Sequence, residues 1–377
     1  MKVVLGHPFI GRGGSEAVVM WLIEALKQNH EVTVLTTGGW NLAELNAYYG
    51  TQVKASEVRV RIASVPWPVR NYSAAALRGA FFQRGARRVA HEYDIRISAY
   101  SPIDWGMPAI HFIADFSWHR ELREKFDPPT PGYIYRDTVL RRAYLGLAAA
   151  CVPRSRRNVL RDDKVIANSR WTADQIQQAC GVECAGVIYP PVWTEFPSVP
   201  WQEKEDAFVM IGRIAAEKRI EEAISILETV RARGYKVRLH LCGEISEDQY
   251  GNSIAQLCRE RAAWIVMEGR VSGERKNYIL THCRYGIQMR SAEPFGISVA
   301  EMVKAGAIVF TPSNGGQTEI LAQSDLLFAG NDDALAKICA VMANAHLQAD
   351  IRKHLSCQAL EFTSTAFIRD TCDLLGG

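Results

Sequence analysis

The sequence predicts an α/β protein with two domains, each built on a doubly wound parallel sheet, and two observations carry this prediction. Strand-like and helix-like segments alternate at the start of the chain, with an apolar strand at 2–6, a helix at 16–28 and a strand at 31–37. The same alternation returns in the second half. The chain also has 377 residues, more than one hydrophobic core usually organises.

In the second half, the alternation predicts strands at 208–212, 236–242, 264–268, 285–289 and 308–311, and helices at 217–233 and 297–303. The run 196–206 between the halves has two prolines and a cluster of charges without apolar periodicity. We therefore predict an N-terminal domain at 1–196 that the final segment 363–377 rejoins, a linker at 197–206, and a C-terminal domain at 207–362.

Composition restricts the compartment and the partners. Nine cysteines stand in no paired pattern, and the closest pair, Cys180 and Cys184, has no companion ligands for zinc. Met1 and Lys2 run directly into the first strand, and no apolar run is long enough to span a bilayer. We therefore expect a cytoplasmic location, in solution or on the cytoplasmic face of a membrane. A net charge of +3 without a recognised motif argues against nucleic acid as a partner.

The segment from Glu293 to Glu301 holds two carboxylates on either side of a predicted helix start at Gly296. The first free amides of such a helix, near Ile297 and Ser298, attract phosphate. Glu293 precedes the helix, where it could accept hydrogen bonds from hydroxyl groups, while Glu301 lies among apolar residues and needs a partner. The alternative is that both are ordinary helix acids, with Glu293 favoured by the helix dipole.

Two further junctions between a strand and a helix have matching character. Arg213 follows the strand that ends at Gly212, and Lys218 lies five residues beyond Arg213. Two cations at the carboxyl end of a strand can neutralise a diphosphate, although they could also be surface residues at a turn. The third junction carries Gly315 and Gly316 after the strand 308–311.

These residues resemble a known family. Glu293-Pro294-Phe295-Gly296 with Glu301 is similar to the E-x7-E motif of the retaining GT-B glycosyltransferases of family 4. Arg213 and Lys218 resemble the basic pair of that family, and Gly315, Gly316 and Glu319 resemble its downstream glycines and acid. The segments 3–16, 165–172 and 187–191 are also similar to the family, so the resemblance covers almost the whole chain. It implies the GT-B fold, with two Rossmann-like domains facing across a cleft.

The resemblance also implies an activity, the transfer of a hexose from a nucleotide sugar to an acceptor hydroxyl with retention of configuration. No D-x-D motif is present to hold a metal on the diphosphate, so we expect no metal and no cofactor besides the donor. Glu293 would hold sugar hydroxyls, and Glu301 would accept from the donor ribose. The implied catalytic residues are Glu293, Lys218, Arg213 and His111, and the implied donor-binding residues are Gly13, Gly14, Arg213, Lys218, Pro294, Phe295, Gly296, Ile297, Ser298 and Glu301.

His111 is assigned by position only, because a histidine from this region of the family reaches the donor sugar. Asp115 or His119 could hold that role instead, and a lone histidine at a strand end is often structural. The glycine loop with Gly13 and Gly14 lets the backbone approach a phosphate or an acceptor sugar. It does not predict a dinucleotide site, because Glu16 stands where a third glycine would be needed.

Donor and acceptor are less defined. Within the family, three segments look most like mannosyltransferases of lipid-linked oligosaccharide assembly: His111-Phe112, Tyr189-Pro190-Pro191 and the stretch 133–144. This likeness favours GDP-mannose and leaves a UDP-hexose open. The acceptor would be a sugar or a lipid-linked sugar. Two alternatives remain: a sucrose-type or sugar-phosphate synthase with a small soluble acceptor, and a non-catalytic protein that binds nucleotide sugars.

Basic residues gather in two stretches of the N-terminal half. From Arg136 to Arg161 there are seven arginines against one acid, Asp137, and the stretch 77–88 is both basic and aromatic. Amphipathic basic stretches can contact an anionic membrane, which would suit a lipid-linked acceptor. The alternative is a solvated helix face whose arginine stems cover apolar surface.

Overall fold

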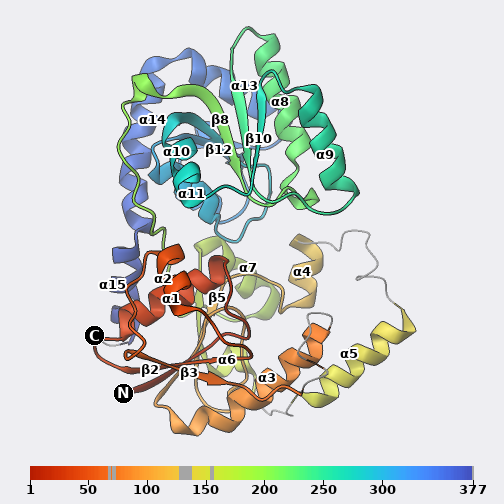
Figure 1. The fold of residues 1–377 in the computed structure, drawn as a ribbon, viewed down its shortest axis with the longest axis vertical. Helices are drawn as coiled ribbons and strands as arrows, with labels where there is room; N and C mark the ends of the chain where they lie inside the picture. Colours follow the sequence, from red (N-terminus) through yellow and green to blue (C-terminus); the bar gives the residue numbers. More distant parts are fainter. Residues whose placement is uncertain (67–68, 70–73, 127–137, 153–156, 376–377) are drawn as a thin grey trace. The chain divides into compact units, whose positions relative to one another are not determined.

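The computed structural model describes the chain except for residues 67–68, 70–73, 127–137, 153–156 and 376–377. The chain forms two compact units: unit 1 is Met1–Trp193 with Ser364–Gly377, and unit 2 is Thr194–Thr363. Each unit holds one parallel sheet with helices on it, which confirms the predicted α/β class (Figure 1). The division falls three residues before the predicted boundary at 196 and one residue after that at 363.

Unit 1 contains a seven-stranded sheet in the order β3-β2-β1-β4-β5-β6-β7. Its strands are β1 (Lys2–Gly6), β2 (Glu31–Thr36), β3 (Val58–Ile62), β4 (Ile95–Ser98), β5 (Ile110–Ile113), β6 (Lys164–Ala167) and β7 (Gly186–Val187). Its helices are α1 (Gly14–Leu26), α2 (Leu42–Tyr49), α3 (Ala75–Val89), α4 (Arg120–Phe126), α5 (Val139–Cys151), α6 (Val159–Asp162), α7 (Arg170–Cys180) and α15 (Ser364–Leu375).

The alternation of side chains along β1 divides the core of unit 1 between the two faces of the sheet. Val3 and Leu5 pack in one cluster with residues of α1, whereas Val4 packs in a second cluster with residues of α3 such as Phe82. Helix α15 lies along α1 in Figure 1 and adds Phe367 to the first cluster. The final segment therefore supplies part of the core of unit 1.

Unit 2 contains a six-stranded sheet in the order β10-β9-β8-β11-β12-β13. Its strands are β8 (Glu205–Ile211), β9 (Arg238–Cys242), β10 (Ile265–Gly269), β11 (Cys283–Ile287), β12 (Ile308–Pro312) and β13 (Leu327–Phe328). Its helices are α8 (Ile220–Ala232), α9 (Gln249–Glu260), α10 (Gly273–His282), α11 (Ile297–Lys304), α12 (Gln317–Leu321), α13 (Asn331–Ala343) and α14 (Ala345–Gln358).

The segment predicted as a linker, 197–206, lies inside unit 2. Trp201 lies edge-on to Tyr285 at a ring distance of 6.0 Å, and the guanidinium of Arg352 stacks over the Trp201 ring at 4.6 Å. Strand β8 begins at Glu205, within the same segment. The segment was predicted as a linker from its prolines and charges, but the contacts of Trp201 hold it against unit 2.

Both sheets reverse their strand order next to their first strand. In unit 1 the reversal lies between β1 and β4, and in unit 2 between β8 and β11. In open α/β sheets, the loops after two such strands diverge at the carboxyl edge of the sheet, and ligands bind between them. The topology thus assigns one candidate ligand edge to each unit.

Candidate functional site

An ion pair stands at the strand reversal of unit 2. Lys218, from the loop after β8, donates through Nζ to Oε2 of Glu293 at 3.1 Å, and Glu293 comes from the loop after β11. Both side chains are largely buried, with 15% and 18% of their surface exposed. The structure thus brings together two residues predicted as catalytic that lie 75 positions apart in the chain.

A third loop holds the backbone of Glu293. Its carbonyl accepts from the amide of Gly316 at 2.8 Å, and the preceding Ala292 donates its amide to the carbonyl of Asn314 at 3.1 Å. Gly315 has a φ of +112°, and a Cβ on it would lie 2.8 Å from the backbone of Glu293, so only glycine fits. Gly315 therefore allows the close approach of the Glu293 backbone, and Gly316 donates a hydrogen bond to it.

Strain at Ala292 accompanies this arrangement. Ala292 has a φ of +57°, in the left-handed region that costs a non-glycine residue about 1 kcal/mol or more. Gln317, fully buried on α12, donates its side-chain amide to the carbonyl of Arg290 at 2.9 Å, on the other side of the strained residue. The loop that carries Glu293 is therefore fixed from both sides.

The Glu293 carboxyl is ionised in this setting. Burial is the strongest single influence and opposes ionisation, but the charges of Lys218 and Arg290 and the hydrogen bond from Lys218 together lower its pKa below the ordinary value. Arg290 Nε lies 3.6 Å from Oε2, the same oxygen that Lys218 contacts. Within the described part of the chain, Oε1 has no hydrogen-bond donor, so it can accept from a ligand hydroxyl.

Glu301 has the partner that its apolar surroundings require. Lys276 on α10 donates through Nζ to its Oε1 at 2.7 Å, and only 8% of the Glu301 side chain is exposed. Sequence reasoning missed Lys276, because a lysine in the polar helix α10 carries no signal that it faces a buried acid. Arg290 was missed too, although its place three residues before Glu293 could have suggested it.

The start of α11 has the geometry expected of a phosphate site. Gly296 caps the helix with a φ of +104°, and its carbonyl accepts from the amides of Val299 and Ala300 at 2.9 and 3.1 Å. The amides of Ile297 and Ser298 come first in the helix, where no intrahelical acceptor exists for them. Pro294 and Phe295 are buried instead, and the Phe295 ring packs 5.5 Å from that of Phe362. These two residues support the loop.

Arg213 is not part of the ion pair between Lys218 and Glu293. Its side chain is 76% exposed, and it pairs with Glu217 at 2.9 Å. It shares the loop after β8 with Lys218, and this loop is fixed to the loop after β9, because Ile214 donates its amide to the Glu244 carbonyl at 2.8 Å. An exposed guanidinium on a fixed loop can turn toward a bound diphosphate at the cost of a surface ion pair, which is worth little.

In unit 1, Tyr49 holds the glycine loop. Its buried hydroxyl accepts from the amide of Gly13 at 2.7 Å and lies 3.2 and 3.0 Å from the carbonyls of Gly11 and Gly13. The Gly13 amide is therefore occupied by Tyr49, which argues against the predicted contact of this amide with the donor, and donor binding by Gly14 stays a prediction. Tyr49 lies at the end of α2, too far along the sequence to be linked to the loop by pattern.

His111 is placed differently from its predicted role. It lies in the middle of β5 with no exposed surface, and its ring nitrogens lie 2.9 Å from Ser98 Oγ and 3.0 Å from Asp163 Oδ2. Both nitrogens are thus occupied by the protein, which corrects the expectation of a hydrogen bond to a sugar. Strand β5 runs to Ile113, two residues beyond His111, which was expected at the strand end.

Other polar residues gather at the ligand edge of unit 1. His7 follows β1 with Nε2 3.1 Å from Ser15 Oγ, and its ring lies 5.6 Å from that of Tyr100, which follows β4. The Tyr100 hydroxyl donates to Oδ2 of Asp115 at 2.9 Å. Asp115, one of the two alternatives to His111, therefore stands at this edge, whereas His119 lies at the start of the next helix. Sequence reasoning did not single out His7 or Tyr100.

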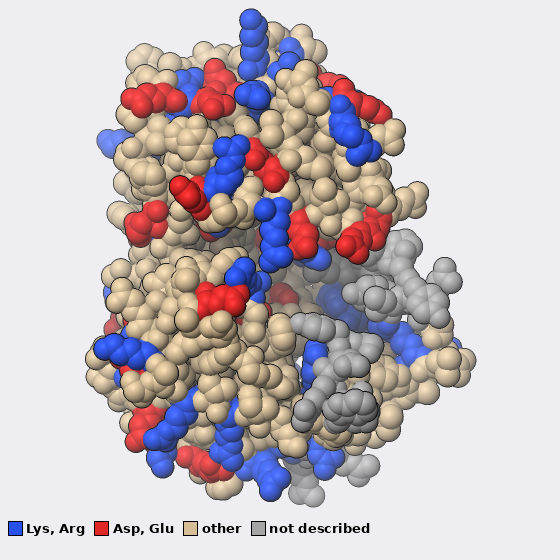
Figure 2. All heavy atoms as spheres, viewed as in Figure 1, with Lys and Arg blue, Asp and Glu red and all other residues tan. Residues whose placement is uncertain are grey.

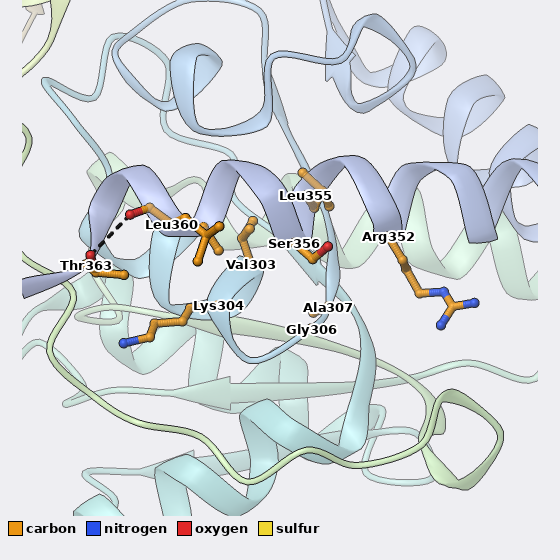
Figure 3. A pocket seen from close by; sticks show the side chains of 10 residues that line it. Val303, Lys304, Gly306, Ala307, Arg352, Leu355, Ser356, Leu360 and Thr363 are labelled. Atoms are coloured by element: carbon orange, nitrogen blue, oxygen red, sulfur yellow. Dashed lines mark hydrogen bonds between the residues drawn. The ribbon is translucent and has the colours of Figure 1, made fainter. Parts of the chain in front are cut away.

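A pocket of about 250 Å³ in unit 2 is a separate feature. It opens between the end of α11 and the helix α14, with Leu355, Leu360 and Val303 on its walls (Figure 3). Glu293 precedes the opposite end of α11, and no predicted site residue lines the pocket. Among the residues that the structure describes, no three His, Cys, Asp or Glu side chains gather so as to hold a metal ion.

Family models match both halves of the chain. Residues 12–196 match the model described as Glycosyltransferase Family 4, and residues 191–355 match the model described as Glycosyl transferases group 1. With the two parallel-sheet units and the Lys218 to Glu293 pair, these matches define a glycosyltransferase of the GT-B class. The chain belongs to glycosyltransferase family 4.

Curated relatives cover part of the chain. A mouse protein named GDP-Man:Man(3)GlcNAc(2)-PP-Dol alpha-1,2-mannosyltransferase is 27% identical over 234 residues, which is 54% of this chain and 46% of the relative. The human protein of the same name is 26% identical over the same shares. The chain thus spans about half the length of the curated relatives it matches.

Solved structures share the whole fold at low identity. HepE from Anabaena, solved with UDP and glucose, matches at a TM-score of 0.70 and 15% identity over all of both chains. Sucrose-phosphate synthase from Thermosynechococcus elongatus matches at a TM-score of 0.71 and 15% identity over 99% of this chain and 98% of the other. WaaG, a glycosyltransferase of lipopolysaccharide biosynthesis, matches at 0.67 and 14% over all of both chains. At these identities the likeness is one of fold.

Proposed function

We propose that this glycosyltransferase moves mannose from GDP-mannose to a hydroxyl of a lipid-linked sugar, with retention at the anomeric carbon and without a metal ion. The observation that carries the proposal is the pair of Lys218 and Glu293 at the strand reversal of unit 2. It sets a cation for the diphosphate beside a carboxylate for the sugar. The names of the mouse and human relatives support mannose and a lipid carrier.

The described side chains suit each part of such a donor. Lys218 and the amides of Ile297 and Ser298 would meet the negative charge of the diphosphate, with Arg213 turning from Glu217 to join them. Oε1 of Glu293 would accept from sugar hydroxyls. The Glu301 carboxylate, held by Lys276, would accept from the two ribose hydroxyls.

Retention by attack on the face of the leaving group fits the surroundings of Glu293. The bond from the anomeric carbon to the departing phosphate oxygen breaks as the acceptor oxygen bonds on the same face, and the acceptor proton passes to the departing oxygen. The described neighbours of the Glu293 carboxylate are the cations Lys218 and Arg290, whereas a double-displacement site needs a second carboxyl group about 5 Å away. The nine cysteines are free thiols, which supports a cytoplasmic location.

Transfer assays with a panel of donors test this proposal. The protein is incubated with GDP-mannose or UDP-hexoses and either lipid-linked or soluble sugars, and the product is identified by mass spectrometry and its anomeric configuration by NMR. We expect α-linked mannose on the lipid-linked acceptor. Transfer only from a UDP-hexose would replace the donor, transfer only to a soluble sugar phosphate would favour a synthase, and donor binding without transfer would favour a non-catalytic role.

A further inference from the structure

The pocket at the end of α11 is lined mainly by apolar groups. Its volume is about 250 Å³, and Val303, Ala307, Leu355 and Leu360 are among the residues that line it. Leu360 remains 68% exposed, so one wall of the pocket faces solvent. A space of this size is smaller than the pockets that hold drug-sized ligands. It suits a small molecule with an apolar body.

Arg352 on α14 brings an unpaired charge to this pocket. The side chain is half-buried, and its guanidinium stacks over Trp201 at 4.6 Å. Its Nε is buried and has no hydrogen-bond acceptor among the residues that the structure describes, and none of these residues forms an ion pair with it. A buried charged donor without an acceptor is costly, so an anion in the pocket would stabilise Arg352.

Lys204 adds a second cation behind Gly306. Its side chain is buried, and Nζ donates to the carbonyl of Ala305, the residue after α11, at 2.8 Å. Gly306 lines the pocket with a φ of +83°, and a Cβ on it would lie 3.3 Å from that Nζ. Burial lowers the pKa of Lys204 to about 8, Cys283 opposes this shift, and the charge of Arg352 adds to it. The two cations therefore act on each other at this end of the pocket.

The cation at the other end of the pocket has an acid. Lys304 pairs with Glu195 at 2.8 Å. In Figure 3 the side chains of Lys304 and Arg352 extend on opposite sides of Val303 and Leu360. The charge without a described counter-charge thus lies at the Arg352 end, and apolar side chains separate it from Lys304.

Cations on the surface of unit 2 have acids beside them. Basic and acidic side chains are intermixed over the visible face of this unit (Figure 2). Arg219 pairs with Glu222 at 2.6 Å, for example, and Arg261 pairs with Glu228 at 3.2 Å. Arg352 and Lys204 differ from these cations, because the described residues give them carbonyl and ring contacts but no carboxylate.

The basic stretches of unit 1 also contain paired arginines. Arg87 pairs with Asp104 at 2.9 Å, and Arg157 pairs with Asp163. The membrane contact considered for these stretches stays a prediction. Four members of the second stretch lie outside the described residues: Arg136, Asp137, Arg154 and Arg156.

We propose that the pocket binds a small organic anion, a carboxylate with an apolar chain, with the carboxylate at Arg352 and the chain against Val303 and Leu355. A guanidinium can hold a carboxylate through two hydrogen bonds, and the chain would remove the apolar walls from water. The pocket lies at the opposite end of α11 from the proposed diphosphate site. The inference therefore stands or falls independently of the proposed donor and acceptor.

Calorimetric titration of the full chain tests the proposal without donor or acceptor. The probe is octanoate, and acetate, octylamine and inorganic phosphate are titrated for comparison. We expect saturable binding of octanoate at one site per chain, much weaker binding of acetate, which lacks the chain, and none of octylamine, which is a cation. Absence of saturable octanoate binding, or equal binding of octylamine, would overturn the proposal. Binding of phosphate in place of octanoate would overturn the apolar part of it.

A matched pair of arginine variants locates the charge. Arg352→Met removes the cation and keeps an unbranched stem over Trp201, so the affinity for octanoate should fall roughly tenfold or more. The control is Arg231→Met, because Arg231 also stacks on a tryptophan of unit 2, Trp264, at 5.2 Å. It should bind octanoate as the unchanged protein does. Normal binding by Arg352→Met, or an equal loss in the control, would refute the assignment.

Ser356 allows a test that leaves Arg352 in place. It is exposed, lines the pocket and lies one turn after Arg352 on α14. Ser356→Asp sets a carboxylate beside the guanidinium and should compete with octanoate for it, whereas Ser356→Asn has nearly the same shape without the charge. The affinity should fall several-fold more in Ser356→Asp than in Ser356→Asn. Equal affinities of the two variants would contradict a bound carboxylate.

Leucine methyl NMR of the unchanged protein locates the chain of the ligand. The methyl signals of Leu355 and Leu360 should shift as octanoate is added, whereas those of Leu227, buried on α8, should stay in place. Unchanged signals of Leu355 and Leu360 at saturating octanoate would mean that another surface binds it, and the proposal would be wrong.

Discussion

Unit 1 and unit 2 both reverse their strand order beside their first strand, yet different side chains line the two ligand edges. In unit 2 the loops after β8 and β11 bring Lys218 and Arg290 to one carboxylate, Glu293. In unit 1 the loops after β1, β4 and β5 bring together a histidine, a phenol and a carboxylate, those of His7, Tyr100 and Asp115. One edge offers fixed cations, and the other offers neutral groups and a hydrogen-bond acceptor.

The contrast suggests how the two substrates are divided. A diphosphate is best met by fixed cations and helix amides, which the edge of unit 2 supplies. A sugar acceptor carries hydroxyl groups, which pair with carboxylates, phenols and uncharged histidines. The proposed function thus assigns a different ligand to each sheet, and the loops after the strands supply the side chains for it. The following experiments try to break or sharpen this division.

The largest effect is expected from Lys218→Ala. The substitution removes the buried cation beside the leaving diphosphate, so kcat should fall on the order of 100-fold or more. The control is Lys337→Ala, which breaks an ion pair with Asp333 elsewhere in unit 2 and should leave kcat unchanged. Steady-state kinetics with thermal unfolding of each variant separates loss of chemistry from loss of fold, and near-normal kcat in a folded Lys218→Ala would refute the cation role.

Glu293 and Glu301 should differ in kinetic signature. Glu301→Ala removes acceptance from the ribose, which changes little on the way to the transition state, so KM should rise roughly tenfold or more with kcat nearly intact. Glu293→Ala removes a contact to the sugar on which charge develops, so kcat should fall. Identical signatures from the two variants would show that the division of roles is wrong.

Lys276→Met tests whether that lysine positions Glu301. It leaves the carboxylate in place without its ion pair, so KM for the donor should rise in the same direction as in Glu301→Ala while kcat stays nearly unchanged. The double variant with Glu301→Ala should be no worse than Glu301→Ala alone. Additive losses would mean that Lys276 contacts the donor directly.

A smaller effect concerns the charge of His7. Burial lowers its pKa below the ordinary value, against opposing influences from the Glu16 charge and the backbone at Phe9. The unfolded chain therefore binds a proton more readily than the folded one, so the free energy of unfolding should fall as pH drops below about 6.5 toward the lower pKa of the folded state. His7→Asn should flatten that part of the pH profile in urea titrations.

The control for His7 is the exposed His91→Asn, whose profile should follow that of the unchanged protein. An unchanged slope in His7→Asn would mean that His7 binds a proton as readily in the folded protein as in the unfolded chain. The unit 1 edge would then carry a cation of its own at mildly acidic pH, and the contrast between the two units would weaken.

The smallest expected effect is that of EDTA. The cations proposed for the diphosphate are side chains, so activity should be the same with and without the chelator, measured as initial rates at saturating donor. Activity lost to EDTA and restored by magnesium or manganese would mean that a metal ion neutralises the diphosphate. The conclusion that side-chain cations of unit 2 are sufficient for this would then be wrong.

The sequence was sufficient to predict the fold class and to predict that the motifs containing Lys218, Glu293 and Gly315 lie together. The alternation of strands and helices predicts both sheets, and the spacing of Lys218, Glu293 and Gly315 relative to three strand ends places them at one edge, because carboxyl ends of parallel strands meet there. Gly315 could be expected near a close backbone approach, but its partner, the backbone of Glu293, is visible only in three dimensions.

Partners that lie far apart in the sequence could not be predicted. Lys276 meets Glu301 across two helices, and Tyr49 reaches the glycine loop from the end of α2, and neither contact leaves a local pattern. The prediction for His111 failed because the strand ends two residues later than expected, which places this side chain in the core and not at the ligand edge. The prediction of a linker at 197–206 failed because Trp201 has prolines and charged residues as neighbours in the sequence, although its ring packs on unit 2.

The docking of α15 on α1 has a consequence for synthesis on the ribosome. Phe367 completes the core around α1, so unit 1 begins to form with the first strand but closes only after about 170 further residues of unit 2 have been translated. Unit 2 is continuous in the chain and can fold as soon as it emerges. The half of the enzyme that is made first is therefore finished last, and during elongation the uncovered face of α1 is the part most in need of protection by chaperones.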